Sequence, residues 1–316
     1  MTNQPNSWAY RFALLAAISA VPLVLFGGSV TTLGAGMAVE GWLIAEGHFL
    51  LFFPVDSWFR DTATFVEHTH RLFGMLVGLF AIASVVASFA SRESAGARGL
   101  ALLGLLLVCG QGVLGGFRVL ENEPRLAFLH GAAAQAVFAA LCASAWVLHR
   151  GWKRGFRKEQ RPGMGLRLLA LGAVLLVYAQ IVLGAWYRHA LRPTPMAEAA
   201  GRFMWHAFFA LLLGVFLVAL IAACRRAKSE VLLRSANRLV LFLGLQIGLG
   251  VSAWLGYRPS AVGVLEWGLS ILHVLGGGLL LAQTLFIWMW MERSRLISPA
   301  LATGTVDRGL VPREAH

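Results

Sequence analysis

Long apolar stretches recur along this chain of 316 residues, and they constrain its fold more than any other feature. Each is close to the ~20 residues that an α-helix needs to cross the roughly 30 Å hydrocarbon core of a bilayer. Eight are read from the sequence: 12–34, 63–89, 99–117, 126–148, 168–187, 203–223, 239–256 and 265–291. We therefore expect an all-α polytopic membrane protein with eight transmembrane helices.

The composition agrees with this fold class. Hydrophobic residues make up 58% of the chain and charged residues 13%, whereas a soluble domain is about 45–50% apolar and about 25% charged. These values exclude a disordered chain, a collagen and an ordinary water-soluble enzyme. The first apolar stretch follows a single basic residue, Arg11, and lacks a clear small-residue cleavage site, so we expect a retained helix and not a removed signal peptide.

The charge distribution predicts the orientation. A net charge of +12 would suggest nucleic acid for a soluble protein, but here the basic residues form short clusters between apolar stretches, and no nucleic-acid-binding motif is present. An inside N-terminus places most of the 27 Lys and Arg residues on the inner side and most of the 15 acidic residues outside. Both termini are therefore expected in the cytoplasm. The basic segment 149–167 marks the boundary between two halves, either as a topology anchor, which we favour, or as an anionic-lipid site.

An internal repeat divides the chain. The pattern Gln-x-x-Leu-Gly occurs near the outer end of three odd-numbered helices, at Gln111–Gly115, Gln180–Gly184 and Gln246–Gly250. Leu23–Gly27 occupies the matching place in the first helix, without the Gln. We expect two pseudo-symmetric four-helix bundles, residues 1–150 and 151–291, followed by a cytoplasmic tail, 292–316. The pattern is typical of close helix packing, and contact with a bound cofactor is the open alternative.

Four of the nine histidines lie at one depth. His70, His130, His206 and His273 fall in the first third of the four even-numbered helices, and therefore in the outer half of the membrane. One such histidine could be a satisfied interhelical hydrogen bond, but four at matching depth favour ligands. Facing histidines in a bundle can bind one heme iron from both sides. We expect the pairs His70/His130 and His206/His273, with a bare metal or a proton relay as alternatives.

The two expected sites differ in their neighbours. Glu67 lies one turn before His70 on the same helix face, while His68 lies about 200° round the helix from His70 and faces elsewhere. Aligning His70 with His206 places Phe203 opposite Glu67. The first site therefore has a carboxylate that can move protons or stabilise developing positive charge, whereas the aromatic neighbour of the other site is typical of a passive redox centre. A simple i, i+4 ion pair between Glu67 and Arg71 is the alternative.

Outer-side arginines are candidate partners for the propionates of a heme, with interfacial anchoring as the alternative reading of each. They are Arg71, Arg118, Arg125, Arg188, Arg202 and Arg258.

These residues also carry a family resemblance. The matching segments are Gly27–Val39, Glu67–Arg71, Gln111–Gly116, Leu129–Gly131, Gln180–His189, Trp205–His206 and Leu272–His273. On them, the chain resembles the heme A synthases of aerobic bacteria and mitochondria over nearly its whole length, up to about Met291. The Glu-x-x-His-Arg segment with three further helical histidines is the specific part, because glycine motifs alone are weak.

The resemblance implies a reaction and its participants. Heme O would be the substrate, held in the N-terminal half by His70 and His130, and its C8 methyl group would be oxidised to an alcohol and then, through a hydrate, to the formyl group of heme A. Glu67 would assist this chemistry. Heme B, with His206 and His273 as axial ligands, would relay electrons.

The resemblance also implies a setting. It places the protein in the bacterial cytoplasmic membrane as a supplier of heme A to a heme-copper terminal oxidase. The implied partners are the farnesyltransferase that makes heme O, oxidase assembly proteins, membrane lipid and an electron donor that the sequence does not identify.

The first outer loop departs from the resembled family in two ways. Its segment Glu40–His48 differs from the Pro-Asp-Trp-Pro-like run of similar members, and it also lacks their cysteines. Many bacterial members have a cysteine pair in the first outer loop, but residues 36–62 contain none. The three cysteines, Cys109, Cys142 and Cys224, lie within helices or at an inner helix end, so no disulfide is expected. His48 is interpreted as a plain loop histidine.

The main alternative function is a diheme bis-histidine cytochrome that exchanges electrons with quinone, and a heme or ion transporter is a third possibility.

Overall fold

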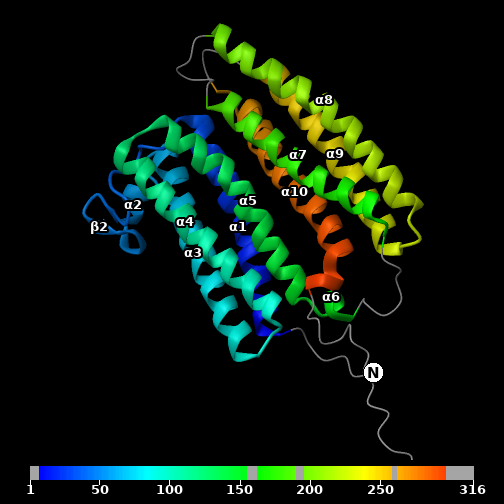
Figure 1. Cartoon of the computed structure of the whole chain (residues 1–316). Helices are drawn as coiled ribbons and strands as arrows, with labels where there is room; N and C mark the ends of the chain where they lie inside the picture. The colour runs from blue at the N-terminus through cyan, green and yellow to red at the C-terminus, as the bar shows by residue number, and fades with distance from the viewer. Residues whose placement is uncertain (1–6, 155–161, 190–195, 258–261, 297–316) are drawn as a thin grey trace, which may run out of the picture.

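The computed structural model describes residues 7–154, 162–189, 196–257 and 262–296, and within these ranges it has eight helices long and apolar enough to cross a membrane (Figure 1). They are α1 (Trp8–Leu33), α3 (Thr62–Ala90), α4 (Ala95–Glu121), α5 (Pro124–Leu148), α7 (Met164–Arg188), α8 (Met196–Arg226), α9 (Glu230–Gly256) and α10 (Val264–Leu296). The predicted fold class is confirmed.

Polar caps extend several helices beyond the apolar stretches. The Asp61 carboxylate accepts a hydrogen bond from the Thr64 amide at 2.8 Å at the start of α3. Ser94 and Ser229 cap α4 and α9 in the same way. Such residues satisfy amide groups that the first helical turn leaves free, and a hydropathy pattern stops short of them because they are polar. At the other end of the chain, α10 continues to Leu296, past the predicted tail boundary at 291, and residues 297–316 of the tail lie outside the described ranges.

The connection between α1 and α3 contains small elements that the sequence did not predict. β1 (Ile44–Ala45) pairs antiparallel with β2 (His48–Phe49), and η1 (Leu50–Phe52) and α2 (Val55–Trp58) follow. Elements this short show too little periodicity to be recognised in a sequence. We call residues 34–61 the first loop. A further short helix, α6 (Arg150–Arg154), follows α5.

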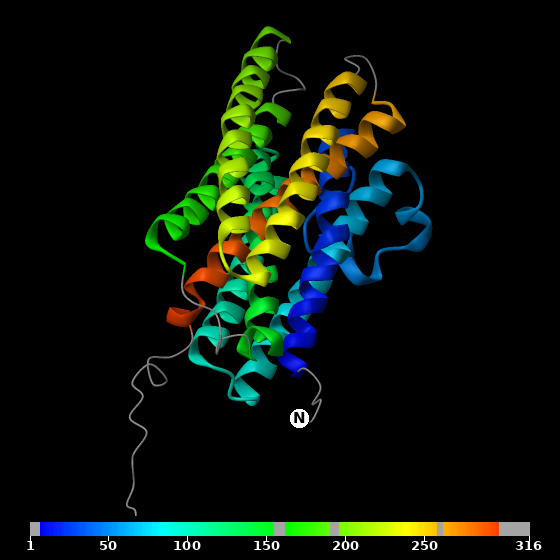
Figure 2. The same ribbon diagram turned by 90° about the vertical axis from the view of Figure 1, so that its right-hand side faces the viewer.

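The eight long helices form two groups that lie side by side (Figure 1). α1, α3, α4 and α5, here called the first half, pack chiefly against one another, and so do α7 to α10, the second half. α10 lies at the centre, because it packs against α7 and α9 and also against α1 and α5 of the first half. Figure 2, viewed from the side of the second half, shows α10 (orange to red) running obliquely to α9 (yellow).

Three consecutive glycines give α10 this central position. A Cβ atom at Gly276 would collide with the amide oxygen of Gln246 on α9, and one at Gly278 would collide with that of Gln135 on α5. At Gly277, a Cβ atom would lie 3.6 Å from Ile181 on α7. Small residues let helix backbones approach closely where the lipid provides no hydrophobic drive for association.

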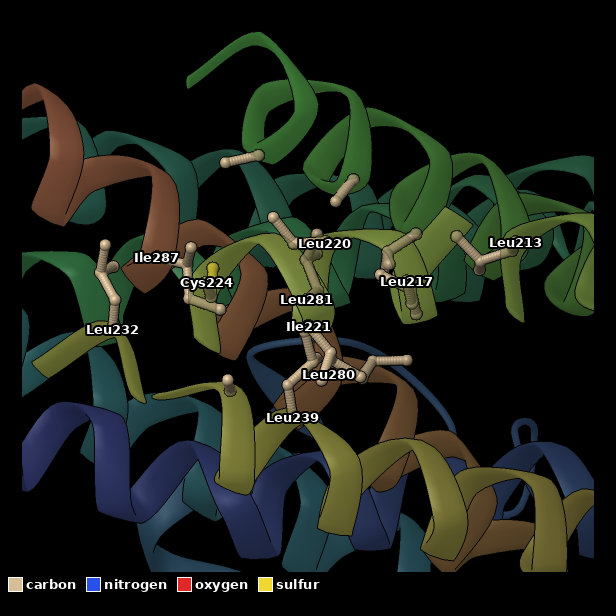
Figure 3. Close-up of a cluster of buried hydrophobic side chains, with 14 of the residues drawn as sticks. Leu213, Leu217, Leu220, Ile221, Cys224, Leu232, Leu239, Leu280, Leu281 and Ile287 are labelled. Carbon is tan, nitrogen blue, oxygen red and sulfur yellow. The ribbon is translucent and has the colours of Figure 1, made fainter. Parts of the chain in front are cut away.

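Two of the buried apolar clusters show how the ends of the helices pack together. In the second half, Leu217 and Leu220 of α8 gather with Leu239 of α9 and Leu281 of α10 (Figure 3). A second cluster joins the starts of α1 and α4, the end of α5, α6 and the end of α10; it contains Ala9, Ala97, Leu148, Trp152 and Met289. The start of α1 and the end of α10 therefore lie at the same end of the molecule. That this end is cytoplasmic stays a prediction from the charge bias.

The contact between α1 and α10 can be tested through Gly28. A Cβ atom at Gly28 would lie 3.2 Å from a side-chain carbon of Ile271 and 3.7 Å from its Cα atom, so a larger side chain meets the backbone of α10. We expect Gly28→Leu to lower the free energy of unfolding by about 1–3 kcal/mol, the usual effect of overpacking. Thermal unfolding of the purified protein in detergent measures this change.

Gly78→Ala on α3 is the matched control, because a Cβ atom there meets nothing within 4 Å. It should leave the melting temperature unchanged or raise it, since Ala is the better helix former. Equal melting temperatures for Gly28→Leu and the wild type would contradict the packing of α1 on α10.

Candidate functional site

The four helical histidines form two pairs with nearly identical geometry. The ring centroids of His70 on α3 and His130 on α5 are 6.3 Å apart, with ring planes at 80°. Those of His206 on α8 and His273 on α10 are also 6.3 Å apart, at 84°. His68 takes no part, because its buried ring stacks on Phe53 of the first loop at 4.5 Å. The structure thus places His70, and not His68, opposite His130.

Each of the four rings lies against a glycine of the preceding long helix. A Cβ atom built on these glycines would be 2.8 to 3.0 Å from the ring Cε1 atom. The four contacts are Gly27 with His70, Gly115 with His130, Gly184 with His206, and Gly250 with His273. These are the glycines of the repeated pattern, and the lack of a side chain is what allows each imidazole to approach the helix.

The same contact orients two of the rings. His70 Nδ1 lies 3.0 Å from the backbone oxygen of Leu23, and His273 Nδ1 lies 3.2 Å from that of Gln246, in each case one turn before the glycine. A carbonyl oxygen only accepts, so Nδ1 carries the proton in each neutral ring. Nε2 is then unprotonated, which is the state in which imidazole binds a metal.

The repeated glutamines hold the backbone that carries two histidines. The Gln111 amide nitrogen donates to the backbone oxygen of His130 at 2.6 Å, and that of Gln180 donates to the backbone oxygen of His206 at 3.0 Å. The buried amide oxygens of Gln180 and Gln246, beside the second pair, have no hydrogen-bond partner. The glycines of the repeated pattern therefore allow close helix packing, and its glutamines leave two amide oxygens without a donor beside the second pair.

The ring separation in both pairs matches that of two imidazoles on opposite sides of one metal ion. A metal–imidazole bond is about 2 Å long, so two imidazoles on one ion have ring centroids roughly 6 Å apart. Within the part of the chain that the structure describes, no group of three or more His, Cys, Asp or Glu side chains could hold a metal ion. A bare ion would therefore have only two ligands of these residue types in each pair, whereas a porphyrin brings its own nitrogen ligands. The paired histidines and the glycines beside them fit a heme better than a bare metal.

Two of the six candidate arginines are partly buried cations near the pairs. Arg118 of α4 donates to the backbone oxygen of Gly36 in the first loop. Arg188, at the end of α7, donates to the backbone oxygen of Gly28 on α1 at 2.6 Å and to the Ser270 hydroxyl on α10 at 3.0 Å. Among the described residues, no carboxylate forms an ion pair with either arginine. Arg188 also ties the two halves together.

The other candidate arginines are placed differently. Arg71 is occupied by Glu67 and by backbone oxygens of the first loop. Arg125 is exposed at the start of α5. Arg202 pairs with Glu198 and lies over the Trp186 ring. Arg258 lies outside the described residues.

The two pairs have unequal surroundings. Glu67 is buried beside the first pair, where one carboxylate oxygen accepts from Arg71 at 2.7 Å and the other from the Val39 amide at 3.0 Å. The ion pair that the sequence left as an alternative is therefore present, and a chemical role for Glu67 stays a prediction. At the matching position of the second half, Phe203 stacks on Trp254 with ring centroids 5.6 Å apart.

The structure also brings His189 to the first pair. Its ring lies 6.3 Å from that of Phe128 on α5, and its Nε2 atom would be 3.0 Å from a Cβ atom at Gly131, the neighbour of His130. Burial lowers the pKa of His189 to about 4, and the charges of Arg188 and Arg118 add to this effect, so the ring is neutral at pH 7. No sequence pattern links the end of α7 to α5.

The contact between histidine and glycine predicts the effect of one added methyl group. Gly250→Ala places a Cβ atom 2.8 Å from the His273 ring, which must then move. For a heme held by the second pair, we expect the variant to lose most of the bis-imidazole absorbance. Gly248→Ala on the same helix is the control, since a Cβ atom there meets nothing within 4 Å, and it should keep the wild-type spectrum. Equal spectra for the two variants would contradict the role assigned to Gly250.

Comparison with known families identifies a family for this chain. A search of curated proteins gives no match. The family model described as COX15-CtaA, cytochrome oxidase assembly protein, matches residues 10–192, which is more than half of the chain. The matched region contains the first histidine pair, Glu67, and the whole of α7, and it ends before His206 and His273. The chain belongs to the COX15-CtaA family of cytochrome oxidase assembly proteins, the family of the heme A synthases.

Proposed function

We propose that this membrane protein is a heme A synthase, which oxidises the C8 methyl group of heme O to a formyl group by way of hydroxylated forms. The conversion is a four-electron oxidation in which the carbon loses two hydrogen atoms and gains one oxygen atom. When water supplies that oxygen, four protons are released, two from the carbon and two from the water. The family supports a role in cytochrome oxidase assembly. The assignment of a substrate heme and a heme B rests on one observation. The two histidine pairs have the same ring separation, but the first has a carboxylate beside it and the second has aromatic rings.

The first pair is proposed as the substrate site. His70 and His130 would hold the iron of heme O between α3 and α5, which fixes the position of the porphyrin. Glu67 is the candidate catalytic carboxylate, because the second half has Phe203 in the matching place. The buried surroundings of the pair would exclude bulk water from the reacting methyl group.

The second pair is proposed as the heme B site. His206 and His273 would be its axial ligands, with Nε2 of His273 directed to the metal by the hydrogen bond of Nδ1. Bound heme B would supply one-electron chemistry. Phe203, which packs against Trp254 and Tyr187, has no carboxylate at the place where the first half has Glu67, and this suits electron relay.

The wider setting follows from the same proposal. Arg118 and Arg188 are the best-placed partners for propionates, because each is partly buried without a carboxylate partner among the described residues. We propose that the protein lies in the bacterial cytoplasmic membrane with both sites toward the outer face. It would receive heme O from a farnesyltransferase, take part with assembly proteins in supplying heme A to a heme-copper oxidase, and exchange electrons with a donor still to be identified.

The test is extraction of the pigments from the purified, detergent-solubilised protein, followed by mass spectrometry of every heme released. We expect heme B together with heme O, its hydroxylated form or heme A. Absence of any heme would contradict both histidine sites.

Single substitutions should separate the two sites. His130→Ala should abolish heme A formation and leave heme B bound, because it removes a ligand of the first pair only. His273→Ala should remove most of the heme B, because a single remaining imidazole holds the iron weakly. Heme extraction from each variant, with the wild type purified in parallel, measures both effects. The same pigment loss in both variants would contradict the assignment of one heme type to each site.

The equal spacing of the two pairs also fits a second function, a diheme bis-histidine cytochrome that exchanges electrons with quinone. Such a carrier needs neither Glu67 nor a site that admits a farnesylated heme. Heme B alone, after expression in cells that also make heme O, would favour this carrier. Glu67→Ala separates the two functions as well, because a carrier should keep its redox activity after this change and a synthase should lose heme A formation.

A further inference from the structure

Part of the first loop, residues 36–42, is held to the first half by arginine side chains. Arg118 of α4 donates to the backbone oxygen of Gly36. Arg60, near the end of the first loop itself, donates to that of Ala38 at 2.9 Å. Arg71 donates to the backbone oxygens of Val39 and Gly41 at 2.8 and 2.7 Å. Arginine suits this task because its planar guanidinium carries several donors in fixed directions.

Glu67 completes this attachment from α3. One of its carboxylate oxygens holds the Arg71 guanidinium, and the other accepts from the Val39 amide. Glu67 and Val39 are 3% and 0% exposed, so the ion pair and the amide contact are shielded from water. The two carboxylate oxygens are thus both used in fixing the loop, and Arg71 is directed at the loop by its partner.

The attached loop packs on α3 and α4 beside residues that neighbour the first histidine pair. The Trp42 ring lies against Gly116 of α4, next to the glycine that faces His130. The Trp58 ring nitrogen donates to the Thr69 hydroxyl at 3.1 Å, next to His70. Thr69 is 7% exposed, whereas Trp205, which precedes His206 in the second half, is 62% exposed.

We propose that Glu67 is a positioning residue that keeps the first loop closed over the first site through Arg71 and the Val39 amide. The inference rests on the proposed function only in taking that site as the substrate site. The loop then excludes water from the outer side of the reacting heme and fixes its surroundings. Glu67 would act on the reaction through the loop and need not touch the reacting carbon.

This role predicts that both members of the ion pair matter equally. Removing either charge leaves the other buried without its counter-charge and with only backbone groups of the loop as partners, which disfavours the closed arrangement. Glu67→Gln and Arg71→Met should therefore open the loop to a similar extent. If Glu67 instead acts directly on the substrate, Glu67→Gln should abolish heme A formation while the loop stays closed.

The opening of the loop can be measured without any heme. In a Val39→Cys protein, the new thiol lies at a fully buried position and should react slowly with a membrane-impermeant maleimide. Adding Glu67→Gln or Arg71→Met should raise the labelling rate at least tenfold. The parent protein without the Val39 change reports any labelling of Cys109, Cys142 and Cys224, which lie within membrane-spanning helices.

Glu46→Gln in the Val39→Cys protein is the matched control. It removes another ion pair of the same loop, that between Glu46 and Arg60, which is partly exposed and is expected to contribute little. The labelling rate should stay within about twofold of that of the Val39→Cys parent, as expected for an ion pair of small free energy.

The outcomes separate the loop proposal from the proposed function. An unchanged labelling rate in both Glu67→Gln and Arg71→Met would overturn the positioning role, whatever hemes the protein binds. Heme B absorbance from the second pair, after expression without heme O, shows that each variant is folded. A positioning role further requires that Arg71→Met lower heme A formation as strongly as Glu67→Gln, and normal heme A formation in Arg71→Met would overturn it.

Discussion

The close approach of an imidazole ring to a glycine of the neighbouring helix is the contact on which the rest of the arrangement depends. It occurs four times, between α1 and α3, α4 and α5, α7 and α8, and α9 and α10. A larger side chain at any of these positions would push the histidine away from its partner across the bundle. For His70 and His273 the contact also brings Nδ1 close to the carbonyl oxygen one turn earlier in the neighbouring helix, so in these two rings helix packing and ligand orientation have the same cause.

Onto these similar pairs the chain places different outer layers. The first half has a buried ion pair, Glu67 with Arg71, and a structured loop attached to it. The second half has aromatic rings, Phe203 and Trp254, in the corresponding layer. A buried ion pair is a poor source of stability but specifies one arrangement of its surroundings, because either partner alone is costly. The difference between the two outer layers therefore affects the access of water and the arrangement of groups at the first site more than it affects the stability of the fold.

The sequence predicted the long helices and the histidine pairs because both depend on strong, regular signals. Twenty-residue apolar stretches follow from bilayer thickness, and the matching depth of His70, His130, His206 and His273 follows from helix register. It also raised the ion pair of Glu67 with Arg71 as an alternative. It did not predict the first loop, whose form depends on contacts of Val39 and Trp42 with distant helices. Nor did it place His189, because proximity of α7 to α5 is a property of packing between the halves.

Arg188 has a consequence for how the protein is made. Its guanidinium belongs to the second half, yet it binds the backbone of α1 and the hydroxyl of Ser270 on α10. During synthesis, the helices of the first half enter the membrane well before this residue does. The end of α1 beside the first histidine pair therefore gains this contact only when α7 has been inserted. A nascent chain that stops after α5 contains both His70 and His130. It lacks Arg188, whose guanidinium joins α1 to the second half.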